Sequence, residues 1–152
     1  MDEVIKLLRG RVVLCGQLLK LFAELIELLK DNSAETAVVI QKINAITKDL
    51  SKNAAKSQEF LNGVQAKSLS EFLAAQEKDI KRDVAERLLT QTDNFQAQLK
   101  TKIDTAAKLT VNGKKFVDFT LNLMTQTQSG NTYGGAAEAS AQSKRHIFDA
   151  NV

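Results

Sequence analysis

An unbroken helical pattern over the first thirty residues constrains this chain more than any other feature. Between Asp2 and Lys30, apolar residues recur at steps of three and four positions, which is the period of an α-helix. One stripe consists of Ile5, Leu8, Val12, Cys15, Leu19, Phe22, Ile26 and Leu29. A second stripe beside it consists of Leu14, Leu18, Leu21, Leu25 and Leu28. Together the stripes are wider than the face that one partner helix covers, so we expect a coiled-coil helix over 2–31 that packs against two neighbours.

A second helical pattern follows a short polar break. Asp31, Asn32 and Ser33 interrupt the first stripe, and a Ser side chain can accept a hydrogen bond from the free amides at a helix start. Proline, which breaks helices, is absent from all 152 residues. We therefore expect a second helix over 34–62 that forms a hairpin with the first. Its apolar face carries Val39, Ile43, Ile46 and Leu50.

A third pattern is longer than the other two. Ser68 followed three residues later by Glu71 has the spacing of a capping box, which marks a helix start. Beyond it, apolar residues recur every eleven positions, or about three helical turns. They are Leu73, Val84, Phe95, Ala106 and Val117, with Leu88, Leu99 and Leu121 at the same interval. This pattern predicts one helix over 69–124, roughly 80 Å long against about 45 Å for each of the first two.

The excess length of this third helix has two possible outcomes. Either the helix breaks, at 90–93 or at Asn112-Gly113, or part of its apolar stripe stays uncovered and needs a partner. A short β-hairpin with Asn112-Gly113 as its turn is a local alternative, because apolar residues flank the turn on both sides. The expected fold is all-α, an elongated antiparallel bundle or coiled coil of three long helices over 1–125.

The sequence changes character after Thr125. It becomes rich in Gln, Ser, Gly and Ala without helical or strand periodicity, so we expect 126–152 to be a flexible tail. Ile147 and Phe148, near the end of the tail, resemble the isolated apolar anchors through which such segments dock on partners.

Composition and charge argue against several classes of function. The 21 basic and 18 acidic residues alternate along the chain, without the concentrated basic patch of a nucleic-acid-binding protein. One His, one Cys and no phosphate-cradling Gly loop give no basis for an enzyme, a cofactor or a metal site. Charged residues interrupt the apolar N-terminal helix, so it holds no uncharged run near the ~20 residues that a membrane span needs. The single Cys15, expected to be buried, fits a reducing, cytoplasmic compartment.

The C-terminal part carries a specific order of features. The Asn-containing helical segment 112–124 precedes Thr132-Tyr133-Gly134-Gly135. A stretch rich in Gly, Ala and Ser follows, and then Lys144-Arg145-His146-Ile147-Phe148-Asp149, which passes from basic to apolar. In this order and in its long-helix body, the chain resembles the FlgN family of flagellar export chaperones. Members often follow the Tyr-Gly with a polar residue and another Gly, whereas this chain has Gly135, Ala136 and Ala137, so the turn there can differ.

The resemblance implies a bacterial cytoplasmic protein that holds flagellar hook-associated proteins unassembled and delivers them to the flagellar export gate by the type III pathway. Terminal helices of such substrates bury their apolar faces only in the assembled filament, so a free copy needs a temporary groove. We expect the uncovered stripe through Val117, Leu121 and Met124 to supply that groove, and the resemblance assigns Tyr133 to the export gate.

Two other functions remain open at this stage. A helical adaptor or coiled-coil assembly protein would use the same wide apolar stripes, which also allow a homodimer. A bundle that binds lipid surfaces is the third reading, although a helix of that kind concentrates basic residues on its polar face.

Overall fold

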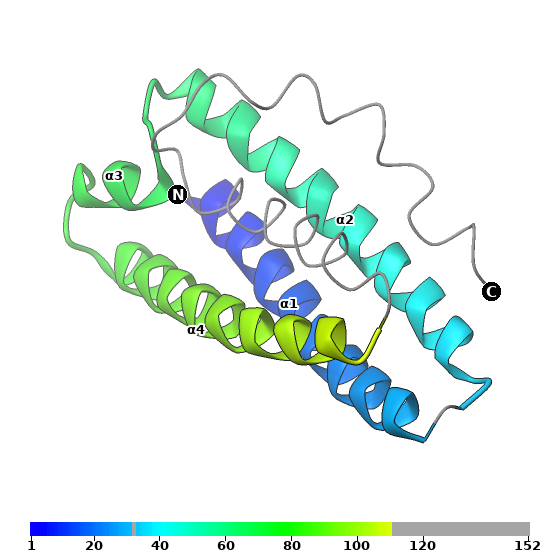
Figure 1. Ribbon diagram of the computed structural model, residues 1–152. Helices are drawn as coiled ribbons and strands as arrows, with labels where there is room; N and C mark the ends of the chain where they lie inside the picture. Colours follow the sequence, from blue (N-terminus) through cyan, green and yellow to red (C-terminus); the bar gives the residue numbers. More distant parts are fainter. Residues whose placement is uncertain (32, 111–152) are drawn as a thin grey trace.

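The computed structural model describes residues 1–31 and 33–110, which form a bundle of helices (Figure 1). Within these residues there are four helices and no strand. They are α1 (Asp2–Lys30), α2 (Thr36–Gly63), α3 (Leu69–Ala74) and α4 (Ile80–Lys108). The all-α class expected from the sequence is confirmed, but the described helices number four instead of three.

The first two helices form the expected hairpin. α1 covers 2–30 and α2 covers 36–63, close to the ranges that the apolar stripes predict. Ser33 helps to close the turn between them. Its Oγ accepts a hydrogen bond of 3.2 Å from Glu35 N, and its carbonyl accepts one of 2.7 Å from Thr36 Oγ1. The polar break therefore separates the two helices, as expected.

The expectation of one continuous helix over 69–124 is wrong. α3 has only six residues, and α4 begins after a five-residue break. Asp79 caps the start of α4, because its Oδ1 accepts a hydrogen bond of 2.7 Å from Arg82 N. Arg82 Nη1 also donates a hydrogen bond of 2.7 Å to the carbonyl of Gln76, just past the end of α3. The residues 76–79 carry no apolar side chain that could pack a continuing helix.

The capping box at the start of α3 is confirmed. Glu71 N donates a hydrogen bond of 3.1 Å to Ser68 Oγ, and Glu71 Oε2 accepts one of 2.8 Å from Lys67 N. α3 is also held against the end of α2, where the rings of Phe60 and Phe72 meet edge to face with centroids 5.1 Å apart. This short helix therefore has a fixed place at one end of the bundle.

α1, α2 and α4 have nearly equal lengths. They contain 29, 28 and 29 residues, which is about 43 Å each at 1.5 Å per residue. α4 is continuous through 90–93, one of the two expected break points, and ends at Lys108. The part of the expected third helix that would overhang the bundle lies beyond residue 110, outside the described residues. Asn112-Gly113, the alternative hairpin there and the tail 126–152 lie outside them.

α1 is the central helix of the described bundle. It packs along both α2 and α4, as its two apolar stripes predict, whereas α3 packs against α4. α2 runs antiparallel to α1, and α4 runs parallel to it (Figure 1). An ion pair of 2.9 Å between Asp2 Oδ1 and Lys81 Nζ joins the first turns of α1 and α4. The starts of these two helices therefore lie at the same end of the bundle.

Two apolar clusters form the core. The larger contains Cys15, Leu18, Phe22, Leu25, Ile26, Val39, Ile43, Leu50, Leu99, Ile103 and Ala106. The smaller, toward the start of α1, contains Val4, Leu8, Leu61, Leu69, Leu73 and Ala85. The burial expected for Cys15 and Phe22 is confirmed, since both are fully buried. Leu19 is only half-buried and packs at the edge of the larger cluster.

Candidate binding grooves beside the central helix

A layer of polar side chains lies between the two apolar clusters. Arg11 is its centre and is 1% exposed. The guanidinium Nη2 donates a hydrogen bond of 2.8 Å to Ser57 Oγ, and Nε donates one of 3.1 Å to Asn53 Oδ1. Asn53 Nδ2 in turn donates one of 3.0 Å to the Leu7 carbonyl on α1. We call Arg11, Asn53 and Ser57 the polar layer, and its hydrogen bonds fix how far α2 can slide along α1.

Burial sets the protonation of the groups around the polar layer. It lowers the pKa of the Arg11 guanidinium, an effect that Cys15 and Asp93 oppose. It raises the pKa of the Cys15 thiol to about 11 and also raises that of the Asp93 carboxyl, and Arg11 acts against both shifts. An Arg side chain stays charged in proteins and Cys15 stays a neutral thiol at neutral pH, so no thiolate nucleophile arises here.

The described residues hold little else that could perform chemistry. Among them, no group of three or more His, Cys, Asp or Glu side chains is placed to hold a metal ion. None of the helices α1–α4 is long and apolar enough to cross a membrane. Two open grooves lie beside α1, one shared with α2 and one with α4.

The groove between α1 and α2 is the larger of these two, with a volume of about 1110 Å³. Its apolar lining consists of Leu7, Leu14, Phe60 and Val64. Its charged lining consists of Asp2, Glu3, Lys6, Asp49, Lys52, Lys56 and Glu59. The charges are of both signs, and Lys52 Nζ lies 3.0 Å from Asp49 Oδ1. An apolar floor with charged sides suits the packing of another amphipathic helix.

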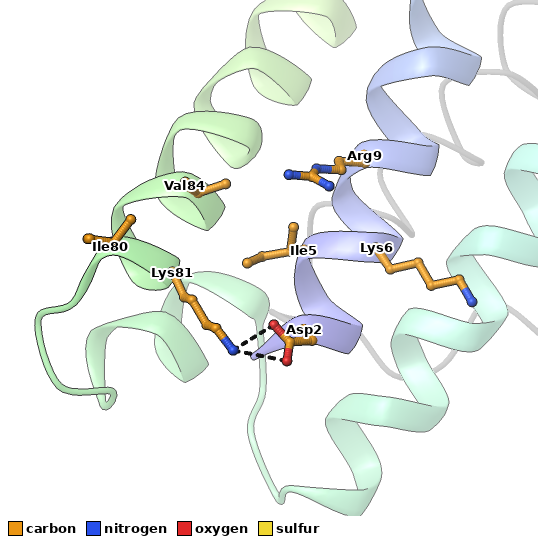
Figure 2. A pocket seen from close by; sticks show the side chains of 7 residues that line it. All are labelled: Asp2, Ile5, Lys6, Arg9, Ile80, Lys81 and Val84. Atoms are coloured by element: carbon orange, nitrogen blue, oxygen red, sulfur yellow. Dashed lines mark hydrogen bonds and ion pairs between the residues drawn. The ribbon is translucent and has the colours of Figure 1, made fainter.

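The groove between α1 and α4, which we call the α1–α4 groove, has a volume of about 440 Å³. Figure 2 shows Ile5 on α1 directed toward α4, where Ile80 and Val84 complete the apolar lining. Ile80 is 82% exposed, the largest exposure among the large apolar side chains of the described residues. The ion pair between Asp2 and Lys81 closes one end of this groove (Figure 2).

The residues that the sequence singled out for binding lie outside the described part of the chain. They are Val117, Leu121, Met124, Tyr133, Ile147 and Phe148. The two grooves combine apolar residues of the predicted stripes with apolar residues outside them. Ile5, Leu14 and Val84 belong to the stripes, whereas Phe60, Val64 and Ile80 do not. Apolar residues that break a helical stripe beside charged positions were the signal that could have found these surfaces.

Comparison with known proteins connects these features to a family. Neither the curated proteins nor the solved structures contain a match to this chain. A family model described as FlgN protein matches residues 1–141, which include all four described helices and the segment around Tyr133. Because the match covers far more than half of the 152 residues, this chain belongs to the FlgN family.

Proposed function

We propose that this chain is a flagellar export chaperone that binds hook-associated proteins, keeps them unassembled and delivers them to the export gate. The observation that carries the proposal is membership of the FlgN family, a chaperone family of flagellum biogenesis. The open, apolar-lined grooves beside α1 support it, because such grooves accept an amphipathic helix. The terminal segments of hook-associated proteins form such amphipathic helices, and their apolar faces are buried only after assembly.

The C-terminal residues are proposed to divide two tasks. Val117, Leu121 and Met124 recur at helical spacing and supply apolar contacts to the substrate helix. Tyr133, in the Thr-Tyr-Gly segment, contacts the export gate, and Ile147 with Phe148 provides further anchors. These assignments rest on sequence spacing and on the order of features within the family, and they place substrate and gate contacts on different segments.

Substrate binding is tested by calorimetric titration of a purified hook-associated protein into the full-length chain. Leu121→Asp places a carboxylate on the apolar stripe, where burying it beneath a partner helix costs several kcal/mol, so binding should collapse. Asn122→Asp adds the same charge one position away, off the stripe, and should bind as the wild type does. Equal binding by Leu121→Asp and the wild type would remove this segment from the substrate site.

Gate recruitment is tested with Tyr133→Ala. This variant should bind the hook-associated protein as tightly as the wild type, because the proposed gate contact lies outside the substrate stripe. In cells it should reduce secretion of that protein and motility, while Leu121→Asp should lower both by losing the substrate. Loss of substrate binding by Tyr133→Ala in calorimetry would merge the two tasks.

A further inference from the structure

The long helices α1, α2 and α4 occupy three corners of a four-helix arrangement. α2 and α4 both pack along α1 but share no comparable contact with each other, so they lie at diagonal corners with α1 between them (Figure 1). The remaining corner lies between α2 and α4 and faces α1. At the end where α1 begins, α3 fills this corner, because Leu73 joins the smaller cluster with Val4 and Phe72 meets Phe60 of α2.

A buried stripe of α1 continues beyond the reach of α3. Cys15, Leu18 and Phe22 lie on the same face of α1 as Val4, and each is fully buried. α3 has six residues, or about 9 Å, and its buried residues belong to the smaller cluster. The larger cluster, which holds the three side chains, takes its other described members from α1, α2 and α4. Two helices that flank a face without meeting cannot seal it, so the full burial of these side chains requires a further cover.

The described chain ends where this cover has to begin. An ion pair joins the first turns of α1 and α4. Farther along, a Cβ added to Gly16 of α1 would lie 3.6 Å from Phe95 Cε2 of α4, at the same offset between the two helices. Lys108, the last residue of α4, is therefore level with the last turn of α1. A helix over 111–124 is about 21 Å long and can return from there over the second half of α1.

The segment 111–124 has the pattern of a helix with two apolar stripes. The aromatic stripe consists of Phe116, Phe119 and Leu123. The aliphatic stripe lies on the other side of Thr120 and consists of Val117, Leu121 and Met124. The face opposite Thr120 is polar and carries Lys114, Asp118 and Asn122. A helix with two apolar stripes has room for two partners, and the aromatic stripe offers the larger area for burial.

We propose that residues 111–124 form a helix antiparallel to α4 that fills the corner between α2 and α4. The aromatic stripe covers the second half of the α1 stripe, from Cys15 to Phe22. The aliphatic stripe is left at the surface for the exported substrate. This second assignment rests on the proposed function, whereas the packing of the aromatic stripe is a property of the free chain. The corner is then closed by α3 at one end and by the C-terminal segment at the other.

Phe119→Asp in the full-length chain should detach this helix from the bundle. The midpoint of urea unfolding should fall by about 1 to 3 M, because the change removes a buried ring and buries a carboxylate. The thiol of Cys15, on the covered stripe, should react with a thiol reagent at least about tenfold faster than in the wild type. Asn122→Asp is the matched control on the polar face and should change neither value. Equal midpoints and thiol rates for the two variants would overturn the packing.

A second measurement does not require a destabilised variant. The chain contains no Trp, so a single introduced Trp reports on its own surroundings. Phe119→Trp should emit at shorter wavelength than Asn122→Trp in the native protein, because position 119 faces the apolar stripe of α1 and position 122 faces solvent. In concentrated urea the two variants should emit alike. Equal emission in the native state would overturn the packing even if Phe119→Asp failed to fold.

Leu121→Asp separates the two stripes. Its urea midpoint should stay within about 0.5 M of the wild type, while calorimetry should show loss of binding to a purified hook-associated protein. A midpoint as low as that of Phe119→Asp would overturn the division between the stripes. If the wild type binds no hook-associated protein while the Trp and urea results hold, the proposed function alone fails. Equal Trp emission together with a urea midpoint that rises with protein concentration would assign the cover to a second copy and overturn the inference.

Discussion

The guanidinium of Arg11 donates a hydrogen bond of 2.8 Å to Ser57 Oγ, which joins α1 to α2 between the two apolar clusters of the bundle. The pair is separated by 46 residues in the sequence. A buried cation is expensive unless its donors are satisfied, so this contact can form only in one register of the two helices. We infer that the polar layer specifies the alignment of α1 and α2, while the apolar clusters supply most of the stability.

Replacing Arg11 tests this division. Arg11→Ala should lower the free energy of unfolding by about 2 to 5 kcal/mol, because it leaves a cavity and removes the donor to Asn53. Arg11→Met fills most of the volume and should cost much less, as buried ionic groups often do when apolar ones replace them. Urea unfolding measures both values. A loss below about 0.5 kcal/mol for Arg11→Ala would mean that the layer is not closely packed.

Phe22 is a purely structural residue in this account. It is fully buried in the larger cluster, so Phe22→Ala should lower the free energy of unfolding by about 3 to 5 kcal/mol. Val13→Ala is the control on the same helix, since Val13 is 57% exposed and should change stability little. Partner binding should be lost only as Phe22→Ala unfolds. A folded, stable Phe22→Ala protein without partner binding would place this part of α1 in the binding face.

Cys15 makes the free energy of unfolding depend on pH in the alkaline range. Burial raises its pKa to about 11 in the folded protein, above the ordinary value of 9.0. Between these values the unfolded thiol loses its proton while the folded thiol keeps it, so the free energy of unfolding falls as pH rises from 9 to 11. Cys15→Ala should be less stable at neutral pH but should show a shallower fall over this range in urea titrations at several pH values.

The same burial protects the Cys15 thiol from modification. At pH 8 the native protein should react with a thiol reagent far more slowly than the protein in concentrated urea, because the thiol is fully buried and protonated. Absorbance of the released chromophore follows the reaction. Equal rates in the native and unfolded states would show that the α1 core opens readily.

Gln65 offers a stabilising substitution. It has a φ of 54° after the end of α2, and Ala66 N donates a hydrogen bond of 3.1 Å to the Leu61 carbonyl, as in a Schellman helix end. Glycine adopts this left-handed conformation without the strain of a side chain, so Gln65→Gly should raise the free energy of unfolding by roughly 0.5 to 1 kcal/mol. Lys67→Gly is the control and should not stabilise. A lower melting temperature for Gln65→Gly would contradict the strained turn.

The sequence predicted the parts of the fold that depend on local signals. The stripes of α1 and α2 and the Ser68–Glu71 capping box are contained in short stretches, and each of them is confirmed. The break before α4 was missed because Leu73 and Val84 stay eleven residues apart whether or not the helix is continuous. Asp79 is a preferred N-cap residue, but without Glu or Gln three positions later it gives a weaker signal than Ser68.

The polar layer and the grooves could not be read from periodicity. Arg11 looks like a solvent-facing charge in α1, and only the approach of Asn53 and Ser57 from α2 shows that it is buried. The α1–α4 groove is lined by Ile5 and Ile80 from two helices whose relative placement follows from the break at 75–79. Contacts of this range follow from the tertiary fold, which the local pattern does not determine.

The central claim, that this chain is a chaperone for hook-associated proteins, is tested most directly by isolating it at native expression from its own cells. Partners that remain bound through gel filtration are then identified and quantified by mass spectrometry. The account predicts a stable complex with one or more hook-associated proteins, and free protein when those proteins are deleted. Recovery of the chain bound only to unrelated assembly proteins or to lipid, with no hook-associated protein in any fraction, would contradict it.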